Sequence, residues 1–201
     1  MNSLSDVLKN RPPYSPRPNV TTPPDYLRPP WNPTVPARYA DVKAADVPAN
    51  ILEKYQEVRK TRQGLYIHGK VGTGKTHIAY ALYRFPVSEG ARFWNTTELL
   101  KEIREDFGRS VGERREVDES LMEHRNVLFL DDMGAEKISD WVLETFYLII
   151  NRYYNEKLPI VFTSNCTIRE LADKVGNRIA SRIVEMCHVI ELPGTDRRLK
   201  K

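Results

Sequence analysis

The stretch Gly69-Lys70-Val71-Gly72-Thr73-Gly74-Lys75-Thr76 decides the fold, because it matches the phosphate-loop pattern G-x-x-x-x-G-K-[ST]. A short apolar run, residues 64–68, precedes the loop and predicts a buried strand. Residues 76–84 follow the loop and predict a helix, whose apolar face holds Ile78, Ala81, Leu82 and Phe85. A strand, a glycine-rich loop and a helix in this order predict a nucleotide-binding α/β domain.

The residue types of this loop suit phosphate binding. Gly69, Gly72 and Gly74 allow positive φ angles and a close approach of the backbone to a ligand. The loop N–H groups and the helix N-terminus form an anion site, where Lys75 reaches the β- and γ-phosphates and the Thr76 hydroxyl holds Mg²⁺. The predicted ATP-binding residues are Gly69, Lys70, Val71, Gly72, Thr73, Gly74, Lys75, Thr76 and His77. The alternative is a glycine-rich turn that matches the pattern by chance.

A second motif consists of two adjacent carboxylates after an apolar run. Residues 127–130 are Val-Leu-Phe-Leu, which suits a parallel strand buried on both faces, and Asp131 and Asp132 follow. Ligands of open α/β sheets bind at the carboxyl ends of such strands. We therefore expect Asp131 to position Mg²⁺ together with Thr76, and Asp132 to polarise the attacking water. The alternative is a strand that ends in an ordinary polar turn before Gly134.

A third apolar run ends in polar side chains. Residues 158–162 predict another strand, and Thr163, Ser164 and Asn165 follow it. Asn165 is placed to hydrogen-bond the γ-phosphate or the lytic water, although an asparagine before a helix is also a common turn residue. Residues 167–170 form a capping box that opens the next helix.

These elements follow one another in an order that resembles a known family. The pieces are Gly-x-x-Gly-x-Gly-Lys-Thr, Leu-Asp-Asp-Met-Gly-Ala-Glu-Lys, Ile-Asn-Arg-Tyr-Tyr, Phe-Thr-Ser-Asn and Asn-Arg-Ile-Ala-Ser-Arg-Ile. They resemble the DnaC/DnaI-type replicative helicase loaders and the related IstB transposition ATPases, both AAA+ proteins. The resemblance spans residues 37–201, after a lead-in at residues 35–39. It implies an AAA+ P-loop core with a five-stranded parallel sheet flanked by helices, dependent on ATP and Mg²⁺.

The resemblance also implies roles for residues outside the two nucleotide motifs. Asn165 takes the sensor 1 position. Arg178 or Arg182, and preferably Arg178, is an arginine finger that enters the ATP site of a neighbouring subunit in a homo-oligomer. Arg197 or Arg198, after a strand at residues 188–192, takes the sensor 2 position. The alternative for each arginine is an ordinary solvated basic side chain.

The sequence departs from the family pattern in three places. Asp132 stands where most AAA+ enzymes have Glu, although this branch commonly has Asp there. We expect the helical lid to be minimal or absent, because the sequence ends at Lys201 just after the sensor 2 arginines. We likewise expect the separate N-terminal helicase-binding domain of the family to be missing or reduced.

Composition divides the chain into two regions. Ten of the fourteen prolines lie in residues 1–36, and no glycine precedes Gly64, so residues 1–36 form a proline-rich extended arm before the ATPase domain at 37–201. The sequence shows no secretory signal or membrane span, and Cys166 and Cys187 are expected as small core residues in a reducing cytoplasm.

The evidence for nucleic-acid binding is local. The net charge of +4 is modest, but residues 104–125 carry several arginines around Gly108 and Gly112, and we expect a flexible loop there that faces single-stranded DNA: Arg104, Arg109, Arg114, Arg115 and Arg125. Acidic residues are interspersed, so a solvated connector is the alternative.

Four functions are compatible with these motifs. The leading one is an oligomeric loader of a hexameric replicative helicase, acting on single-stranded DNA. An IstB-like transposition helper uses the same chemistry. A small-molecule P-loop kinase is disfavoured by Asn165 and by the Arg178/Arg182 pair. A nucleotide-gated DNA-binding module with negligible turnover is the fourth.

Overall fold

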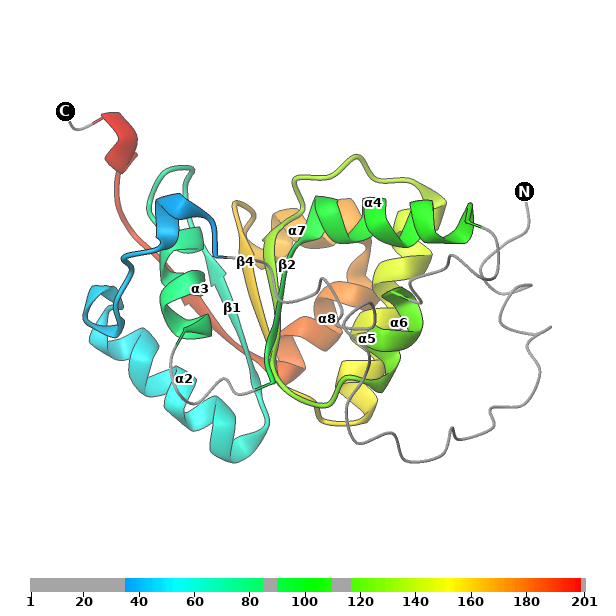
Figure 1. The fold of residues 1–201 in the computed structure, drawn as a ribbon, viewed down its shortest axis with the longest axis horizontal. Helices are drawn as coiled ribbons and strands as arrows, with labels where there is room; N and C mark the ends of the chain where they lie inside the picture. Colours follow the sequence, from blue (N-terminus) through cyan, green and yellow to red (C-terminus); the bar gives the residue numbers. More distant parts are fainter. Residues whose placement is uncertain (1–34, 85–89, 110–116, 200–201) are drawn as a thin grey trace.

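The computed structural model describes residues 35–84, 90–109 and 117–199, and only the backbone of residues 59, 118, 119 and 199. One sheet forms the centre of the molecule, and helices cover both of its faces (Figure 1). The strands are β1 (Gly64–His68), β2 (Arg92–Asn95), β3 (Leu128–Met133), β4 (Ile160–Ser164) and β5 (Cys187–Glu191). The α-helices are α2 (Ala49–Thr61), α3 (Lys75–Tyr83), α4 (Thr96–Phe107), α5 (Val117–Glu123), α6 (Asp140–Asn155), α7 (Ile168–Val175) and α8 (Asn177–Met186). Short 3₁₀ helices are η2 (Ala37–Tyr39), η3 (Ala44–Asp46) and η5 (Arg197–Leu199).

The five strands run parallel in the order β2-β3-β4-β1-β5, which confirms the predicted five-stranded parallel sheet. Chain neighbours β1 and β2 are three positions apart, because β3 and β4 insert between them. The order in which the chain adds strands to the sheet therefore changes direction next to β1. α/β sheets bind ligands at such a switch point, at the carboxyl ends of the strands.

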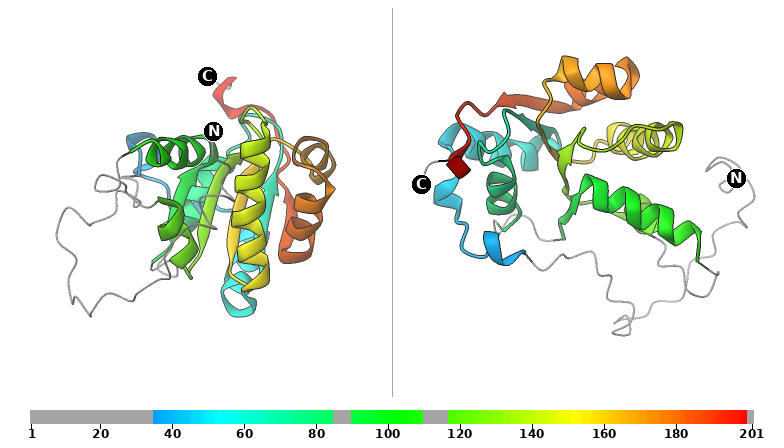
Figure 2. Two further views of the ribbon diagram at one scale, coloured as in Figure 1. Left: turned by 90° about the vertical axis from the view of Figure 1, so that its right-hand side faces the viewer. Right: turned by 90° about the horizontal axis from the view of Figure 1, so that it is seen from above.

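Alternating side chains of the strands supply two cores. In β1, Tyr66 packs in a cluster with residues of α4 to α8, whereas Leu65 and Ile67 pack in a cluster with residues of α2 and α3. This period of two is what a strand buried on both faces requires. Figure 1 shows α2 and α3 on the left of the sheet and α4 to α8 on the right, and Figure 2 shows the same separation from above.

The strand that carries the two carboxylates is longer than the sequence predicted. We expected Asp131 and Asp132 after the strand, but β3 continues through both of them to Met133. Leu130 pairs with Phe162 and Met133 with Ser164, so two residues of β3 stand opposite Thr163 alone. This is a β-bulge, which twists a strand and re-aims a side chain. Asp132 has a φ of 59° in the bulge, in the left-handed region.

Several local predictions are confirmed. The capping box at Thr167 and Glu170 opens α7. Cys166 and Cys187 are free and buried. The predicted arm lies outside the described residues up to position 34, and so does Phe85. Within the described ranges, no helix combines the length and apolarity needed to cross a bilayer.

Candidate functional site

The phosphate loop connects β1 to α3 and has the predicted backbone geometry at two of its three glycines. Gly72 and Gly74 have φ angles of 77° and 101°. Gly69 does not have a positive φ, contrary to our expectation. Glycine is required at position 69 for close packing instead, because a Cβ there would lie 2.4 Å from the carbonyl oxygen of Leu192.

The ammonium group of Lys75 points back into this loop. Its Nζ donates hydrogen bonds of 2.8 Å to the carbonyl oxygens of both Gly69 and Lys70. Burial lowers the pKa of Lys75, and the nearby Asp132 and Asp131 carboxylates act in the opposite direction. A buried cation held by two neutral carbonyls can exchange these contacts for an anionic phosphate, which is the stronger partner.

Asp131 is held by two hydroxyl groups. Thr76 Oγ1 donates to one carboxylate oxygen at 3.1 Å, and Thr163 Oγ1 donates to the other at 2.5 Å. Asp131 is only 5% exposed, and burial raises its pKa, while the bonds from Thr163 and then Thr76 lower it. Thr96 fixes the backbone by donating to the Asp131 carbonyl oxygen at 2.8 Å.

The Thr76 hydroxyl and the Asp131 carboxylate fit a magnesium ion by their chemistry. Both are hard oxygen donors, and Mg²⁺ is commonly held by one or two protein groups together with substrate phosphates and waters. The part of the chain that the structure describes contains no cluster of three or more His, Cys, Asp or Glu for a metal. Phosphate oxygens would therefore have to complete the coordination of any ion at this site.

Asp132 and Asn165 meet across the ends of two strands. Asn165 Nδ2 donates to Asp132 Oδ1 at 2.9 Å, and the Asp132 backbone N–H donates to Thr163 Oγ1 at 2.9 Å. The Thr163 hydroxyl thus contacts both acidic residues, as an acceptor from one and a donor to the other. Sequence reasoning gave Thr163 no role, because the motif only shows that it precedes Asn165.

These groups open on one cavity of about 450 Å³, a size common for small-molecule sites. The predicted residues that line it are Val71, Gly72, Gly74, Lys75, Thr76, His77, Asp132, Asn165, Arg197 and Arg198. Lys70 and Thr73 stabilise the loop instead, since Thr73 Oγ1 donates to the Lys70 carbonyl at 2.9 Å. Gly69 and Asp131 lie behind the lining and bond to Lys75 and Thr76.

Two further residues line the cavity that sequence reasoning did not assign. They are Arg38 and Tyr39 of η2, and their only signal was the lead-in to the resemblance. The Tyr39 ring stacks on Tyr80 at 4.6 Å, and Tyr80 stacks on Phe93 at 4.1 Å. This series of rings joins η2 to α3 and β2, so the aromatic edge of the cavity is supported from the core.

The segment after β5 closes another side of the cavity. The Arg197 backbone N–H donates to the Gly72 carbonyl at 3.0 Å, and a Cβ at Gly72 would clash with Asp196 at 1.9 Å. The Arg197 and Arg198 side chains are exposed and line the cavity beside Lys75. The structure therefore brings both candidates for sensor 2 to the site and does not distinguish them by position.

Arg178 and Arg182 lie away from this cavity, on α8. Both guanidinium groups cover the ring of Tyr147 in α6, at 5.0 Å and 5.3 Å from its centre. Arg182 also donates from Nε to Asn151 at 3.1 Å and from its guanidinium to the Arg178 carbonyl at 2.9 Å. The two arginines share a helix face as predicted, and Arg178 is the more exposed of them.

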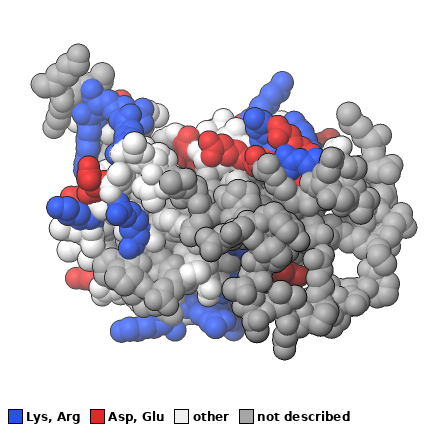
Figure 3. Space-filling model, viewed as in Figure 1, with Lys and Arg blue, Asp and Glu red and all other residues white. Residues whose placement is uncertain are grey.

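Three of the five arginines of the arginine-rich stretch lie in the described residues, and each contacts a neighbouring side chain there. Arg104 lies on α4 over the ring of Trp141, and Arg109 pairs with Asp106 at 3.2 Å just after α4. Arg125 pairs with Glu156 at 2.5 Å. Basic and acidic side chains are interspersed on the described surface seen in Figure 3. The remaining two arginines, Arg114 and Arg115, lie outside the described residues.

Similar proteins are known. The profile of the IstB-like ATP binding protein family matches residues 40–201. The Phage-like element PBSX protein XkdC of Bacillus subtilis is 30% identical over 152 residues, which are 66% of this chain and 51% of that protein. The Replicative helicase loader DnaI of the same organism is 26% identical over 164 residues, 74% of this chain and 51% of that protein. The chain thus spans about half the length of these curated relatives.

A solved structure shows the same fold. The crystal structure of the DnaC helicase loader superimposes with a TM-score of 0.65 at 25% identity, over 78% of this chain and 99% of that one. The predicted AAA+ P-loop fold is therefore confirmed.

Proposed function

Because this chain belongs to the family of IstB-like ATP binding proteins, we propose that it is an ATP-hydrolysing loader of a replicative DNA helicase, active as a homo-oligomer in replication initiation. Its relation to helicase loaders supports the biological role. One observation supports the chemistry: Thr76–Asp131 and Asp132–Asn165 form two polar pairs at one phosphate loop. The first pair has the donors for a metal ion, and the second has a base and an amide facing the cavity.

Each residue then has a stated task in hydrolysis. The loop N–H groups and Lys75 bind the β- and γ-phosphates, and the aromatic edge at Tyr39 is placed to contact the base. Thr76 and Asp131 would hold Mg²⁺, which neutralises charge on the transferring phosphoryl group. Asp132 accepts a proton from the attacking water, and Asn165 orients both the water and the Asp132 carboxylate.

The site is completed by a second subunit. Arg178 is the better candidate for the arginine finger, because Arg182 already donates hydrogen bonds to Asn151 and to a backbone carbonyl. Arg178 can leave the Tyr147 ring at the cost of one cation–π contact, about 0.5–1 kcal/mol at an exposed site. Arg197 or Arg198 contacts the phosphates within the same subunit as sensor 2.

Single-turnover hydrolysis of radiolabelled ATP tests the catalytic proposal. Wild-type protein should release phosphate in the presence of Mg²⁺, and Lys75→Ala should fail to bind nucleotide because the phosphates lose a charged partner. Tight nucleotide binding without release of phosphate would reject the ATPase and support a nucleotide-gated DNA-binding module.

The partner is the second element of the proposal. A loader should bind the purified replicative helicase of the source cell and transfer it to circular single-stranded DNA in an ATP-dependent reaction. A relative that is 28% identical over 148 residues, the putative ATP-binding protein Rv3427c in an insertion sequence of Mycobacterium tuberculosis, favours one other function, a helper of an insertion-sequence transposase. Binding to the transposase but not to the helicase would select that function and reject helicase loading.

The domain division and the cellular location belong to the same proposal. Residues 1–36 form a tether separate from the ATPase domain at 37–201, and the protein works in the cytoplasm, where its DNA substrate is found.

A further inference from the structure

Gly134, which follows the catalytic strand, is held through both of its backbone polar groups. The Gly134 N–H donates to both carboxylate oxygens of Glu136, at 3.1 Å each. The Gly134 carbonyl accepts a hydrogen bond of 2.5 Å from Lys174 Nζ, on the last turn of α7. A Cβ on Gly134 would lie 3.3 Å from the Cys166 sulfur, so the peptide is also closely packed. Helix α7 therefore holds the backbone two residues beyond Asp132 through the Lys174 hydrogen bond.

These contacts at Gly134 affect Asp132, because Asp132 lies in the adjacent β-bulge. A regular strand would place Asp131 opposite Thr163 and Asp132 opposite Ser164, but Met133 occupies that last position. A slip of one residue moves every following side chain to the other face of a sheet. Without the bulge, the Asp132 carboxylate would therefore leave the cavity side that it shares with Asn165.

The bulge carries a conformational cost that other contacts must offset. Asp132 has a φ of 59°, in the left-handed region that non-glycine residues adopt at a conformational cost. Upstream of Asp132, Thr96 fixes the Asp131 carbonyl. Downstream, the Ser164 hydroxyl donates to the Met133 carbonyl at 2.6 Å, and the Glu136 and Lys174 bonds follow at Gly134. Relaxation to a regular strand would move Gly134 by about 3.3 Å along the strand and break its bond to Lys174 of α7. The bond to Glu136, two residues along the same segment, restricts the backbone conformation around Gly134.

We propose that Glu136 and Lys174 are positioning residues that lock this bulge and so hold the Asp132 carboxylate at the nucleotide cavity. The inference rests on the proposed ATPase function, because it assigns Asp132 a place in the hydrolysis step. Neither residue lines the cavity, so their effect on the reaction passes through the backbone of residues 132–134.

The test uses Lys174→Met, which keeps the length of the side chain and removes the donor. We expect kcat for ATP to fall about 10-fold or more, since small misplacements of catalytic groups cost up to about 10²-fold. The KM for ATP should stay within about twofold, because the phosphate loop is untouched. Lys174→Arg keeps a donor and should retain most of kcat. Lys137→Met, at the exposed lysine that follows Glu136, is the matched control.

A second measurement does not depend on turnover. Hydrogen exchange of the Asp132 and Gly134 amides should become faster in Lys174→Met and in Glu136→Ala. The double variant should lose little more than either single one, because both bonds hold the backbone of the same residue, Gly134. Wild-type kcat together with wild-type exchange in Lys174→Met would overturn the proposal. If the wild-type protein does not hydrolyse ATP, the proposed function fails, and the exchange rates alone decide whether the lock exists.

Discussion

The side-chain amide of Asn165 donates a hydrogen bond of 2.9 Å to the carboxylate of Asp132, and both residues line the same cavity as Lys75. The bond joins the end of β4 to the bulge of β3, two segments that are 33 positions apart in the chain. One Asn165 N–H thus orients the Asp132 carboxylate, which leaves the other carboxylate oxygen for a water molecule.

The first prediction follows from this pair. Asp132→Asn removes the proton acceptor but keeps the shape, so the single-turnover rate should fall about 10²-fold or more. Nucleotide affinity, measured by titration with a fluorescent ATP analogue, should change little, because Lys75 and Thr76 remain. Asp173→Asn, at an exposed acid of α7, is the control. Hydrolysis by Asp132→Asn at the wild-type rate would remove Asp132 from the mechanism.

Much of the fold was predictable because its signals are local. The phosphate loop, the apolar runs that became β1, β3 and β4, and the capping box of α7 each depend on neighbours within a few residues. The bulge at Asp131 and Asp132 was not predictable, since it depends on which residue of β4 stands opposite. Two adjacent carboxylates suggest a strand end as readily as a bulge.

The same limit applies to the site. Its phosphate loop lies in one continuous segment, so the motif names every residue of the loop, but the structure places Gly69, Lys70 and Thr73 outside the lining of the cavity. Arg38 and Tyr39 reach the cavity through stacking on Tyr80, some forty positions along the chain. Likewise, only the packing of α8 on α6 distinguishes Arg178 from Arg182. Such relations form in the folded core and leave no periodic pattern in the sequence.

The second prediction concerns catalysis between subunits. If Arg178 completes the site of a neighbour, specific ATPase activity should rise with protein concentration. Arg178→Ala should lose about 10³-fold in rate, as is typical for a missing arginine finger. Mixing it with Lys75→Ala protein should restore part of the activity, because some interfaces then pair an intact finger with an intact loop. Activity that is independent of concentration, without rescue on mixing, would contradict a finger in trans.

The third prediction concerns single-stranded DNA. We expect ATP-dependent binding that weakens as salt rises, because phosphate contacts release counterions. Replacing Arg114 and Arg115 by alanine should reduce the salt slope by about one unit per lost contact. Arg109→Ala should have a smaller effect, since Asp106 and Glu105 already pair with its guanidinium. Arg62→Ala, at an exposed arginine just after the C-terminus of α2, is the control, and equal binding by all variants would assign DNA binding elsewhere.

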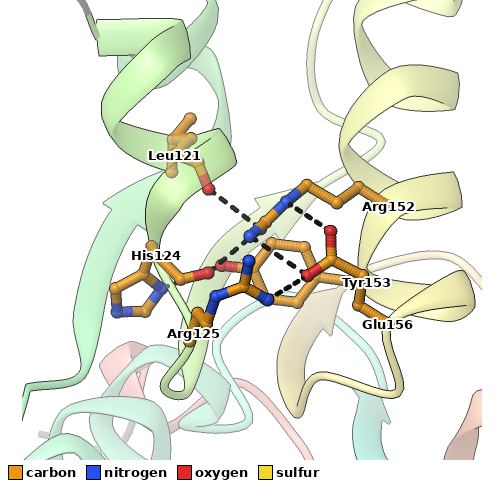
Figure 4. A network of polar contacts seen from close by, with 6 residues as sticks. All are labelled: Leu121, His124, Arg125, Arg152, Tyr153 and Glu156. Atoms are coloured by element: carbon orange, nitrogen blue, oxygen red, sulfur yellow. Dashed lines mark hydrogen bonds and ion pairs between the residues drawn. The ribbon is translucent and has the colours of Figure 1, made fainter. Parts of the chain in front are cut away.

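The fourth prediction is a dependence of stability on pH through His124, in the network of Figure 4. His124 Nε2 lies 2.8 Å from the Gly90 carbonyl, which can only accept, so Nδ1 accepts from the Tyr153 hydroxyl at 2.9 Å. Burial lowers the pKa of His124 and outweighs the hydrogen bond to the Gly90 carbonyl, which raises it, and the charges of Arg92 and Arg152 lower it further. The neutral ring is therefore the form that this network accommodates.

The sign follows from proton binding. Below about pH 6.5 the unfolded chain binds a proton at His124 that the folded chain refuses, so the free energy of unfolding should fall as pH decreases. The loss has an upper limit of about 1.4 kcal/mol per pH unit and ends below the lowered pKa. Urea unfolding between pH 7 and pH 5 should show a shallower decline for His124→Gln than for the wild type. The same change at the partly exposed His77 is the control, and equal declines in all three proteins would refute the assignment.

The fifth prediction separates the arm from the ATPase core. Val35 packs against the cluster that contains Leu65, and the Tyr39 ring stacks on Tyr80. Removal of residues 1–34 should therefore leave the melting temperature and ATP affinity nearly unchanged. Removal of residues 1–40 should lower both, because the aromatic edge of the cavity and the backbone carbonyls bonded by Arg84 are lost.

Comparison of the full chain with the protein that lacks residues 1–34 also tests whether the arm tethers the helicase. The arm carries Leu4, Val7, Leu8, Tyr14 and Trp31, a high apolar content for a segment too proline-rich to form its own core. If it binds the helicase, protein that lacks residues 1–34 should keep its ATPase activity and lose recovery of the purified helicase in a pull-down. The contact should be weak for its area, because ordering a segment on binding costs free energy. Equal helicase recovery by the full chain and the shorter truncation would place the docking surface on the AAA+ core.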